Sequence, residues 1–444
     1  MSVKPPSSLI EKIKPLLKDQ IESFKASMND VATTSVRLHP YKSNHELHLT
    51  EPIAWHSGGY YLDERPKFTL DPYHHAGHYY VQEASSMLIG YIIKQFDFPK
   101  DAKALDACAA PGGKSTLLCD VLGADALIHS NEVNGLRAES LRQNIQRWGY
   151  SNCIVTNATI AHLSSTGITY DLILVDAPCS GEGMMRKEQD AIEQWNQNKI
   201  DHCFKLQTEI TKLIPGLCHE GTIVIYSTCT FNLQENEDVV RQLTQEYPFE
   251  QIEIDFPKQW NIHDHGTKTY RCFPHLSKGE GFSFSVMRYT GLKRKKEPNK
   301  NKLKLSQSAS CPVKMKVPMA YMQKEQSWIA SSEPLFQMAT QLQEFKCKTC
   351  HYGIHLGQFK REDWIPHHSL SMSFLQDRNE QEAISLNLEQ AQNYLRAIDF
   401  YHEEVRGSYQ WILVNYKDAV LGWAKVIQGK LKNYYPKELR IYNL

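Results

Sequence analysis

Three short apolar runs, each ending at a polar turn that contains a cysteine, constrain the fold of this chain more than any other feature. The runs occupy residues 104–107, 172–175 and 222–226. Apolar runs of this length, bounded by turns, are typical of buried strands in a parallel sheet. Reactive groups in open α/β sheets lie at the carboxyl ends of the strands. We therefore expect the three turns to meet in one crevice.

An alternation of strands and helices begins near residue 102. Strands alternating with helices predict a mostly parallel, doubly wound sheet, so the predicted fold class is α/β. The expected strands are 104–107, 127–131, 171–176, 222–226 and 282–289, and the expected helices are 113–123 and 132–148.

The flanking segments differ from this central region. Apolar spacing over 8–28 predicts one amphipathic helix, and 37–87 is expected to be compact but irregular. A lysine-rich run at 293–304 predicts a linker, and 407–414 with 419–425 predicts a hairpin. The expected domains are an N-terminal extension at 1–95, an α/β domain at 96–290, a basic linker at 291–317 and a C-terminal domain at 318–444.

The net charge excludes a wholesale basic surface. Fifty basic and fifty acidic residues give a formal charge of zero, so any nucleic-acid contact must come from local patches. The chain has no apolar signal core and no run of transmembrane length. Its eleven cysteines lack the regular spacing of a disulfide framework. We therefore expect a cytoplasmic protein with reduced thiols and no membrane partner.

The first cysteine-containing turn is a candidate cofactor site. It reads Cys108-Ala109-Ala110-Pro111-Gly112-Gly113-Lys114 and opens a helix. Backbone N–H groups of such a turn can approach a carboxylate or phosphate, although many turns of this kind only connect a strand to a helix. Glu132 ends the next strand, where nucleoside-binding folds bind ribose hydroxyls; the alternative role is a helix N-terminal acid. Together these features favour a nucleoside cofactor.

The other two turns place a carboxyl group and two thiols at strand ends. Asp176 precedes Pro178 and Cys179, and Cys229 stands among three hydroxyl residues. A desolvated Asp can bind a base edge or transfer a proton, or it can cap a helix. A free cysteine can be a nucleophile or a small buried apolar residue. These residues alone leave open which cysteine would be the nucleophile.

The three motifs, in this order, resemble those of the RNA 5-methylcytosine methyltransferase family, the Nol1/Nop2/Sun group. They are Asp-Ala-Cys-Ala-Ala-Pro-Gly-Gly-Lys at 106–114, Asp-Ala-Pro-Cys-Ser-Gly-Glu-Gly at 176–183 and Tyr-Ser-Thr-Cys-Thr at 226–230. Segments at 64–72, 80–87, 183–187 and 431–437 are similar to the bacterial ribosomal small-subunit methyltransferase F branch. The resemblance covers nearly the whole chain.

The resemblance implies an S-adenosylmethionine-dependent methyltransferase with a Rossmann-like catalytic domain at 96–290. It also implies an N-terminal α+β, RNA-binding extension and a C-terminal β-rich, PUA-like RNA-binding domain. By motif position, Cys229 matches the family nucleophile and Cys179 the cysteine associated with product release. Asp176 would bind the base. Lys114 would contact Asp176 or order the turn. The residues implied in cofactor binding are Cys108, Ala109, Ala110, Pro111, Gly112, Gly113, Lys114, Glu132, Asp176 and Asn157, the last near the position of a usual Asp.

The implied reaction is methylation of cytosine C5 in 16S rRNA through a covalent bond between Cys229 and C6. The target base must be unpaired or flipped out. The expected partner is 16S rRNA, free or within the 30S subunit, and the enzyme is expected to be a monomer. Two alternatives stay open: the same chemistry on tRNA, and a ribosome-assembly RNA-binding factor whose catalysis is dispensable.

Further candidates lie outside the three motifs. Aromatic residues interleaved with basic ones suit unpaired RNA, although a solvated tail with buried tyrosines is the alternative. Cys347 and Cys350 form a haem-attachment pattern with His351, but a cytoplasmic enzyme lacks the required export, and a zinc site would need further ligands. We therefore expect no metal. The candidate RNA contacts are Arg186, Lys187, Lys432, Tyr434, Tyr435, Lys437 and Arg440.

Overall fold

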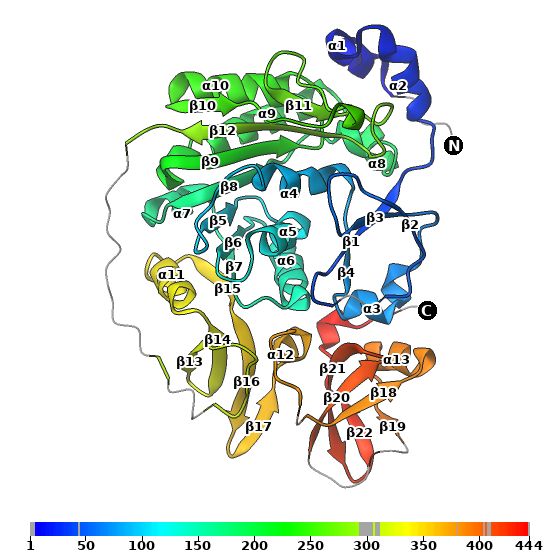
Figure 1. Cartoon of the computed structure of the whole chain (residues 1–444), viewed down its shortest axis with the longest axis vertical. Coiled ribbons are helices and arrows are strands. Elements are labelled where there is room, and N and C mark those ends of the chain that lie inside the picture. The colour runs from blue at the N-terminus through cyan, green and yellow to red at the C-terminus, as the bar shows by residue number, and fades with distance from the viewer. Residues whose placement is uncertain are drawn as a thin grey trace.

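A computed structural model describes most of the chain, which folds into four β-sheets and their covering helices (Figure 1). The basic run predicted as a linker at 293–304 lies outside the described residues. No helix among the residues described is long and apolar enough to cross a membrane. The described residues are 5–42, 45–292, 305–306, 311–379, 381–402, 405 and 410–442.

The N-terminal extension contains helices and a four-stranded antiparallel sheet in the order β2-β3-β1-β4. The single helix predicted over 8–28 is wrong, because the chain turns at Lys18, whose φ is 52°. The region predicted as irregular holds most of this sheet. The elements are α1 (Ser7–Leu17), η1 (Lys18–Gln20), α2 (Ile21–Ser27), β1 (Thr34–Leu38), β2 (Leu49–Pro52), β3 (Gly59–Leu62), η2 (Phe68–Leu70), α3 (Pro72–His75), β4 (Tyr79–Val81), η3 (Ser85–Met87) and α4 (Leu88–Ile93).

The middle of the chain forms a nine-stranded sheet whose central strands are parallel in the order β7-β6-β5-β8-β9. This confirms the doubly wound α/β fold class. The strand order reverses between β5 and β8, and ligands of such sheets bind at the carboxyl ends beside that point. The central strands are β5 (Lys103–Asp106), β6 (Leu127–Asn131), β7 (Cys153–Asn157), β8 (Tyr170–Asp176) and β9 (Cys218–Thr228).

Antiparallel strands extend this sheet at both edges. On one side, β12 (Phe282–Tyr289) pairs with β9, while β10 (Phe249–Ile252) and β11 (Thr269–Cys272) pair with β12. On the other side, β15 (Lys348–Tyr352) pairs with β7. The connecting helices are α5 (Gly113–Leu122), α6 (Gly135–Trp148), α7 (Ile160–Ser165), η4 (Glu182–Met184), α8 (Gln189–Glu193), α9 (Gln197–Thr211), η5 (Ile214–Leu217), η6 (Gln234–Asp238), α10 (Val239–Glu246) and η7 (Lys258–Trp260).

The C-terminal part adds two smaller sheets. One has the order β13-β14-β16-β17 and the other β18-β20-β21-β22-β19. The pairing of β20 with β21 confirms the predicted hairpin. The elements are β13 (Ala320–Lys324), β14 (Ser327–Ser331), α11 (Glu333–Glu344), β16 (Ile354–Lys360), β17 (Asp363–Pro366), α12 (His368–Met372), β18 (Ala383–Leu386), α13 (Leu388–Leu395), β19 (Phe400–Tyr401), β20 (Trp411–Tyr416), β21 (Ala419–Ile427), β22 (Lys430–Asn433) and η9 (Lys437–Leu439).

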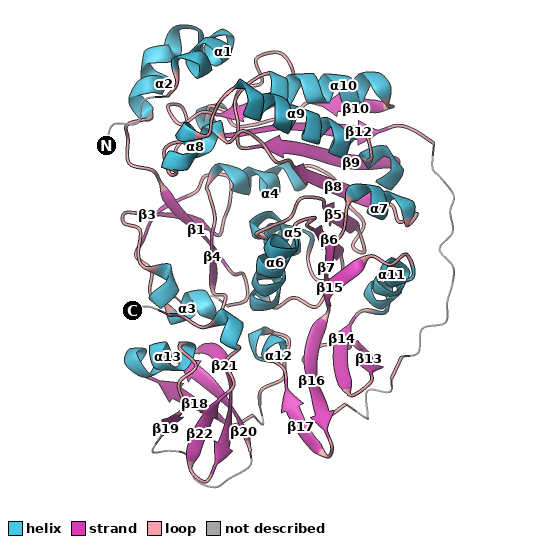
Figure 2. Cartoon of the chain, turned by 180° about the vertical axis from the view of Figure 1, so that it is seen from behind, coloured by secondary structure: helices cyan, strands magenta, loops and turns pink. Residues whose placement is uncertain are grey.

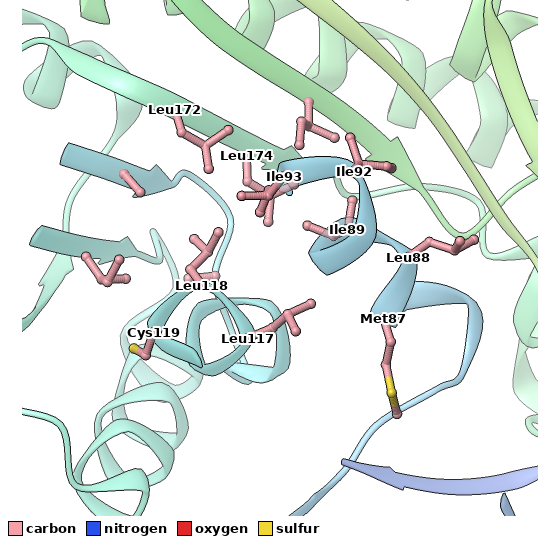
Figure 3. Packing of buried hydrophobic residues seen from close by; sticks show 14 of the residues in the cluster. Met87, Leu88, Ile89, Ile92, Ile93, Leu117, Leu118, Cys119, Leu172 and Leu174 are labelled. Atoms are coloured by element: carbon pink, nitrogen blue, oxygen red, sulfur yellow. The ribbon is translucent and has the colours of Figure 1, made fainter. Parts of the chain in front are cut away.

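Shared hydrophobic clusters join these parts. Figure 3 shows the apolar side chains of α4 facing those of α5 and β8, all of them buried. The N-terminal sheet and the five-stranded C-terminal sheet contribute to a second cluster around α3 and α13 (Figure 2). Burial of apolar surface is the main source of folding free energy. The N-terminal sheet is therefore packed against both the five-stranded C-terminal sheet and the nine-stranded sheet.

A buried cation ties the N-terminal sheet to the helix that follows the candidate cofactor turn. Arg37 of β1 is fully buried and donates to the side chains of Asp120 and Thr116 on α5. Its Nε also donates to Gln82 Oε1 at 2.8 Å. Burial lowers the pKa of Arg37 to about 10, which leaves the guanidinium charged at neutral pH. The extension therefore fixes the position of α5.

Candidate active site

The two cysteines of the strand-end turns lie side by side. Cys179 follows β8 and Cys229 follows β9, and these strands are parallel neighbours. The two Sγ atoms are 3.0 Å apart, and both residues are partly buried. The proximity expected from adjacent strand ends is therefore confirmed, whereas the chemical roles of the two thiols stay predictions.

The contact with Cys229 affects the protonation of Cys179. The hydrogen bond to Cys229, together with burial, raises the pKa of Cys179 well above its usual value. Cys179 therefore keeps its proton at neutral pH. Either sulfur can be the donor of the hydrogen bond between the two residues. An accepting sulfur is the one that can carry the negative charge of a thiolate nucleophile.

Asp176, the last residue of β8, forms the centre of a polar group beside the cysteines. Lys114 Nζ donates to its Oδ2 at 2.8 Å, and Ser227 Oγ donates to its Oδ1 at 2.9 Å. Burial opposes the charge of Lys114, but the charge and hydrogen bond of Asp176 raise the pKa of Lys114 overall. The predicted contact between Lys114 and Asp176 is thus confirmed. It links the candidate cofactor turn to the cysteine-bearing strands.

Two buried glutamates hold the loops that carry the cysteines. Glu235 accepts hydrogen bonds from the backbone N–H and hydroxyl of Ser180, from Asn232 Nδ2 and from Gln207 Nε2. Glu182 accepts from two backbone N–H groups of the Cys229 loop, at 2.7 and 2.9 Å. Buried carboxylates with several donors give strong, directional bonds. These two residues therefore fix the spacing of the thiols.

Sequence reasoning missed both glutamates. Glu182 lies within the motif that contains Cys179, so its position was a usable signal. Nothing in the sequence next to Glu235 indicates its role, because its hydrogen-bond partners come from separate turns and from α9. Only the folded arrangement identifies its function.

The backbone of the candidate cofactor turn requires glycine at position 112. Gly112 precedes α5 with a φ of 114°, and a Cβ atom there would lie 3.1 Å from Leu141 Cδ1. Side chains of α6 hold the turn, since Arg137 Nη2 donates to Ala110 O at 2.8 Å and Asn144 Nδ2 to Pro111 O at 2.7 Å. The turn is therefore rigid and close-packed, as a backbone cradle for a ligand must be.

Polar residues at the ends of β5, β6 and β7 line up beside this turn. Burial raises the pKa of Asp106 to about 7, and Ser115 Oγ donates to its Oδ2 at 2.7 Å. Glu132 is 2% exposed and accepts from Asn134 N through Oε1. Asp106 Oδ1 is buried and accepts no hydrogen bond within the described residues, so it is available to a donor of a ligand. Glu132 Oε2 lies 3.2 Å from Arg137 Nη1, which pairs with its charge.

Asn157 and Cys108 complete the set of predicted cofactor residues. Asn157 Nδ2 donates to the carbonyl oxygens of Glu132 and Val133, each at 2.8 Å. The amide therefore shapes the turn that carries Glu132. Burial raises the pKa of Cys108, which keeps this cysteine a neutral thiol. Cys108 is thereby distinguished from a thiolate nucleophile.

Two predicted RNA contacts are wrong. The side chain of Arg186 is 5% exposed, and its Nε donates to Glu280 Oε2 at 2.7 Å. Tyr435 is 4% exposed and packs in the core beside His75. Sequence cannot reveal these partners, because they are distant along the chain. Lys187 lies 3.7 Å from the same Glu280. The remaining candidates stay predicted contacts: Lys432, Tyr434, Lys437 and Arg440.

The cysteine and histidine pattern at 347–351 does not form a metal centre. Cys347 belongs to a hydrophobic cluster, and His351 stacks on His355. Within the described residues, no group of three His, Cys, Asp or Glu side chains could hold a metal ion.

Family models match three segments of the chain. Residues 96–288 match the model described as 16S rRNA methyltransferase RsmB/F. Residues 6–84 match the N-terminal domain of 16S rRNA methyltransferase RsmF, and residues 381–441 match the methyltransferase RsmF PUA domain. The matches follow one another in the order expected for an N-terminal extension, a catalytic domain and a PUA domain.

Curated relatives extend over nearly the full length of the chain. It is 26% identical to the ribosomal RNA small subunit methyltransferase F of Erwinia tasmaniensis, covering 98% of this chain and 96% of the relative. It is 28% identical to the protein of the same name from Psychromonas ingrahamii, covering 98% and 97%.

Solved structures share the fold. NSun6 from Pyrococcus horikoshii, determined with SFG, aligns with a TM-score of 0.54 at 19% identity, covering 64% of this chain and 98% of that chain. A methyltransferase homologue from the same organism aligns with a TM-score of 0.52 at 23% identity, covering 64% and 99%. These similarities support the Rossmann-like methyltransferase fold.

Proposed function

The chain belongs to the 16S rRNA methyltransferase RsmB/F family, and on this premise we propose that it methylates C5 of a cytosine in 16S rRNA. Family membership carries the coarser statement, that the protein is an S-adenosylmethionine-dependent methyltransferase acting on ribosomal RNA. The cytosine-C5 chemistry and the covalent step are the proposal. The 3.0 Å contact between the Sγ atoms of Cys179 and Cys229 is the observation that carries it.

The site is compatible with S-adenosylmethionine. Asp106 Oδ1 is buried without a partner among the described residues, as expected where a ligand donates a hydrogen bond. Glu132, which pairs with Arg137, follows the neighbouring strand. The glycine-dependent turn at 108–114 and Asn157 stand beside them at the strand ends. When bound, S-adenosylmethionine supplies an electrophilic methyl group on a sulfonium. The protein residues orient the RNA base and manage its protons.

Cys229 would make the base reactive. C5 of cytosine is a poor nucleophile until a thiolate adds to C6, which gives C5 enamine character. Asp176 would bind the N3 and amino edge of the base. Ser227 and Lys114 hold this carboxylate through one oxygen each, so its orientation is fixed before the base enters. Preorganised hydrogen bonds of this kind lower the activation barrier.

Cys179 would release the product. Once Cys229 Sγ is bonded to C6, it no longer accepts the hydrogen bond that holds the proton on Cys179. Cys179 would then give its proton to water. The resulting thiolate takes the C5 proton, the C5–H electron pair re-forms the C5–C6 double bond, and Cys229 leaves as a thiolate.

A pair of cysteine variants tests the two roles. Cys179→Ala should accumulate a covalent protein–RNA adduct in the presence of S-adenosylmethionine, detected on a denaturing gel, because the C5 proton is not removed. Cys229→Ala should form no adduct, and the double variant should behave like Cys229→Ala. An adduct with Cys229→Ala and none with Cys179→Ala would overturn the assignment.

The RNA class is tested separately. Bisulfite sequencing of total RNA from a strain lacking the gene should show loss of one cytosine signal in 16S rRNA. Loss of a tRNA signal instead would contradict the rRNA assignment while keeping the chemistry. Defective subunits without any lost signal would favour the assembly-factor alternative.

A further inference from the structure

Resting on the proposed function, we infer that a cationic cavity where the N-terminal, 311–379 and C-terminal segments meet binds one nucleotide of the substrate RNA through its phosphate and base. The cavity has a volume of about 230 Å³. Cationic side chains and an exposed aromatic ring line it. It lies outside the candidate active site. The residues used in the argument are Tyr41, Lys42, Lys316, Phe374, Arg378 and Asp418.

Three cations line the cavity, and each donates to neutral acceptors. Lys42 Nζ donates to Ala76 O and Arg147 O, at 3.0 and 2.9 Å. Lys316 Nζ donates to Phe374 O at 2.9 Å. Arg378 Nη2 donates to two backbone carbonyls, at 2.6 and 2.9 Å. Among the residues that the structure describes, none of these three forms an ion pair.

The charge of the cavity is therefore incompletely balanced. Asp418 is the one carboxylate in its lining, and it accepts a hydrogen bond from Tyr73. Burial, followed by the charges of Arg378 and Arg147, lowers the pKa of Lys42. Burial lowers the pKa of Arg378 to about 10. Like charges gathered without enough counter-charge favour binding of an anion, and a phosphodiester fits a cavity that carries several N–H donors.

The aromatic ring adds a surface for a base. Tyr41 is 63% exposed, and its ring stacks on Phe374 with centroids 4.7 Å apart and planes inclined by 16°. One face of Tyr41 is thus supported by protein, which holds the ring in place. An exposed aromatic ring beside cations is the arrangement that stacks an unpaired base while its phosphate is neutralised. The cavity therefore suits a nucleotide better than a free inorganic anion.

The position suits a long substrate. Lys42 caps the carboxyl end of α6, whose 14 residues begin beside Asn157 and Glu132. At about 1.5 Å per residue, the cavity and the active site are separated by roughly 21 Å along this helix. A small substrate could not reach both places. A structured RNA can, so the cavity would anchor the RNA away from the reacting base.

Two surface substitutions test the site without removing buried side chains. Tyr41→Ala and Lys316→Gln should each weaken binding of transcribed 16S rRNA about three- to tenfold, because each removes one element of nucleotide recognition. Lys316→Gln should also reduce the slope of log K against log salt by about 0.7 to 0.9, the contribution of one phosphate contact.

Matched controls separate this inference from general charge effects and from the proposed function. Lys324→Gln and Tyr401→Ala change exposed residues of the same types elsewhere and should bind RNA like the wild type. Unchanged RNA affinity and an unchanged salt slope in both Tyr41→Ala and Lys316→Gln would overturn the inference. This holds even if inorganic phosphate alone binds the cavity. RNA binding is measured without methyl transfer, so a failed methylation assay would contradict the proposed function and leave this test intact.

Discussion

Asp106 should make the stability of the protein depend on pH in an identifiable way. Its carboxyl group is fully buried beside the candidate cofactor turn, and burial raises its pKa from 3.8 to about 7. A carboxyl group whose pKa is raised on folding contributes stability below its unfolded pKa and loses that contribution as pH rises through the folded pKa. The free energy of unfolding should therefore fall as the pH rises from about 4 to somewhat above 7.

The size of the effect follows from the two pKa values. Each unit of difference corresponds to about 1.4 kcal/mol, so ionisation of Asp106 lowers the free energy of unfolding by about 2 kcal/mol at pH 5 and about 4 kcal/mol at pH 8. Asp106→Asn removes the ionisation and keeps an acceptor for Ser115. Any cost of burying the new amide is the same at both pH values and cancels in the comparison.

Denaturant unfolding at pH 5 and pH 8 measures this difference. Between pH 5 and pH 8, the free energy of unfolding should fall by about 2–3 kcal/mol more in the wild type than in Asp106→Asn. Ser115→Ala is the matched control, because it removes the hydrogen bond that lowers the pKa of Asp106. This variant should therefore keep Asp106 protonated to a higher pH. Parallel pH profiles for the wild type and Asp106→Asn would refute the reasoning.

Two further substitutions test the geometry of the site. Gly112→Ala should cost about 1–3 kcal/mol and weaken S-adenosylmethionine binding measured by calorimetry, because alanine rarely adopts the φ of 114° found there; wild-type affinity would contradict the role of the turn. Arg186→Met should lower stability by about 3–5 kcal/mol in thermal or denaturant unfolding, because it leaves buried Glu280 without its main partner. An RNA-affinity loss without destabilisation would restore Arg186 as an RNA contact.

The central fold was predictable because its strands are continuous apolar runs. The predicted 127–131 and 282–289 coincide with β6 and β12, and the others differ by a few residues. The N-terminal sheet was not predicted, because its strands have three to five residues and pair with partners distant in sequence. Such short segments acquire their conformation from tertiary contacts rather than from local pattern.

The candidate site was predictable to the extent that strand ends determine it. Cys179, Cys229 and Asp176 meet because β8 and β9 are neighbours, which follows from the α/β alternation. The sequence did not predict that Arg186 is buried against Glu280, or that Glu235 holds the loop that carries Cys179. The partner of Arg186 is 94 residues away, and Glu235 joins three separate segments. The sequence shows that a residue is charged, but it does not show whether the side chain faces solvent or a buried residue of opposite charge.

The strand β15 has a consequence for synthesis of the protein on the ribosome. It covers the edge of β7, yet it is translated roughly 190 residues later. At about 5–20 residues per second, the nascent chain would carry an open strand edge for roughly 10–40 seconds. Exposed edges pair readily with other chains. Completion of the catalytic sheet therefore waits for a segment encoded well after the catalytic motifs, and a chain ending near residue 290 would expose the edge of β7 permanently.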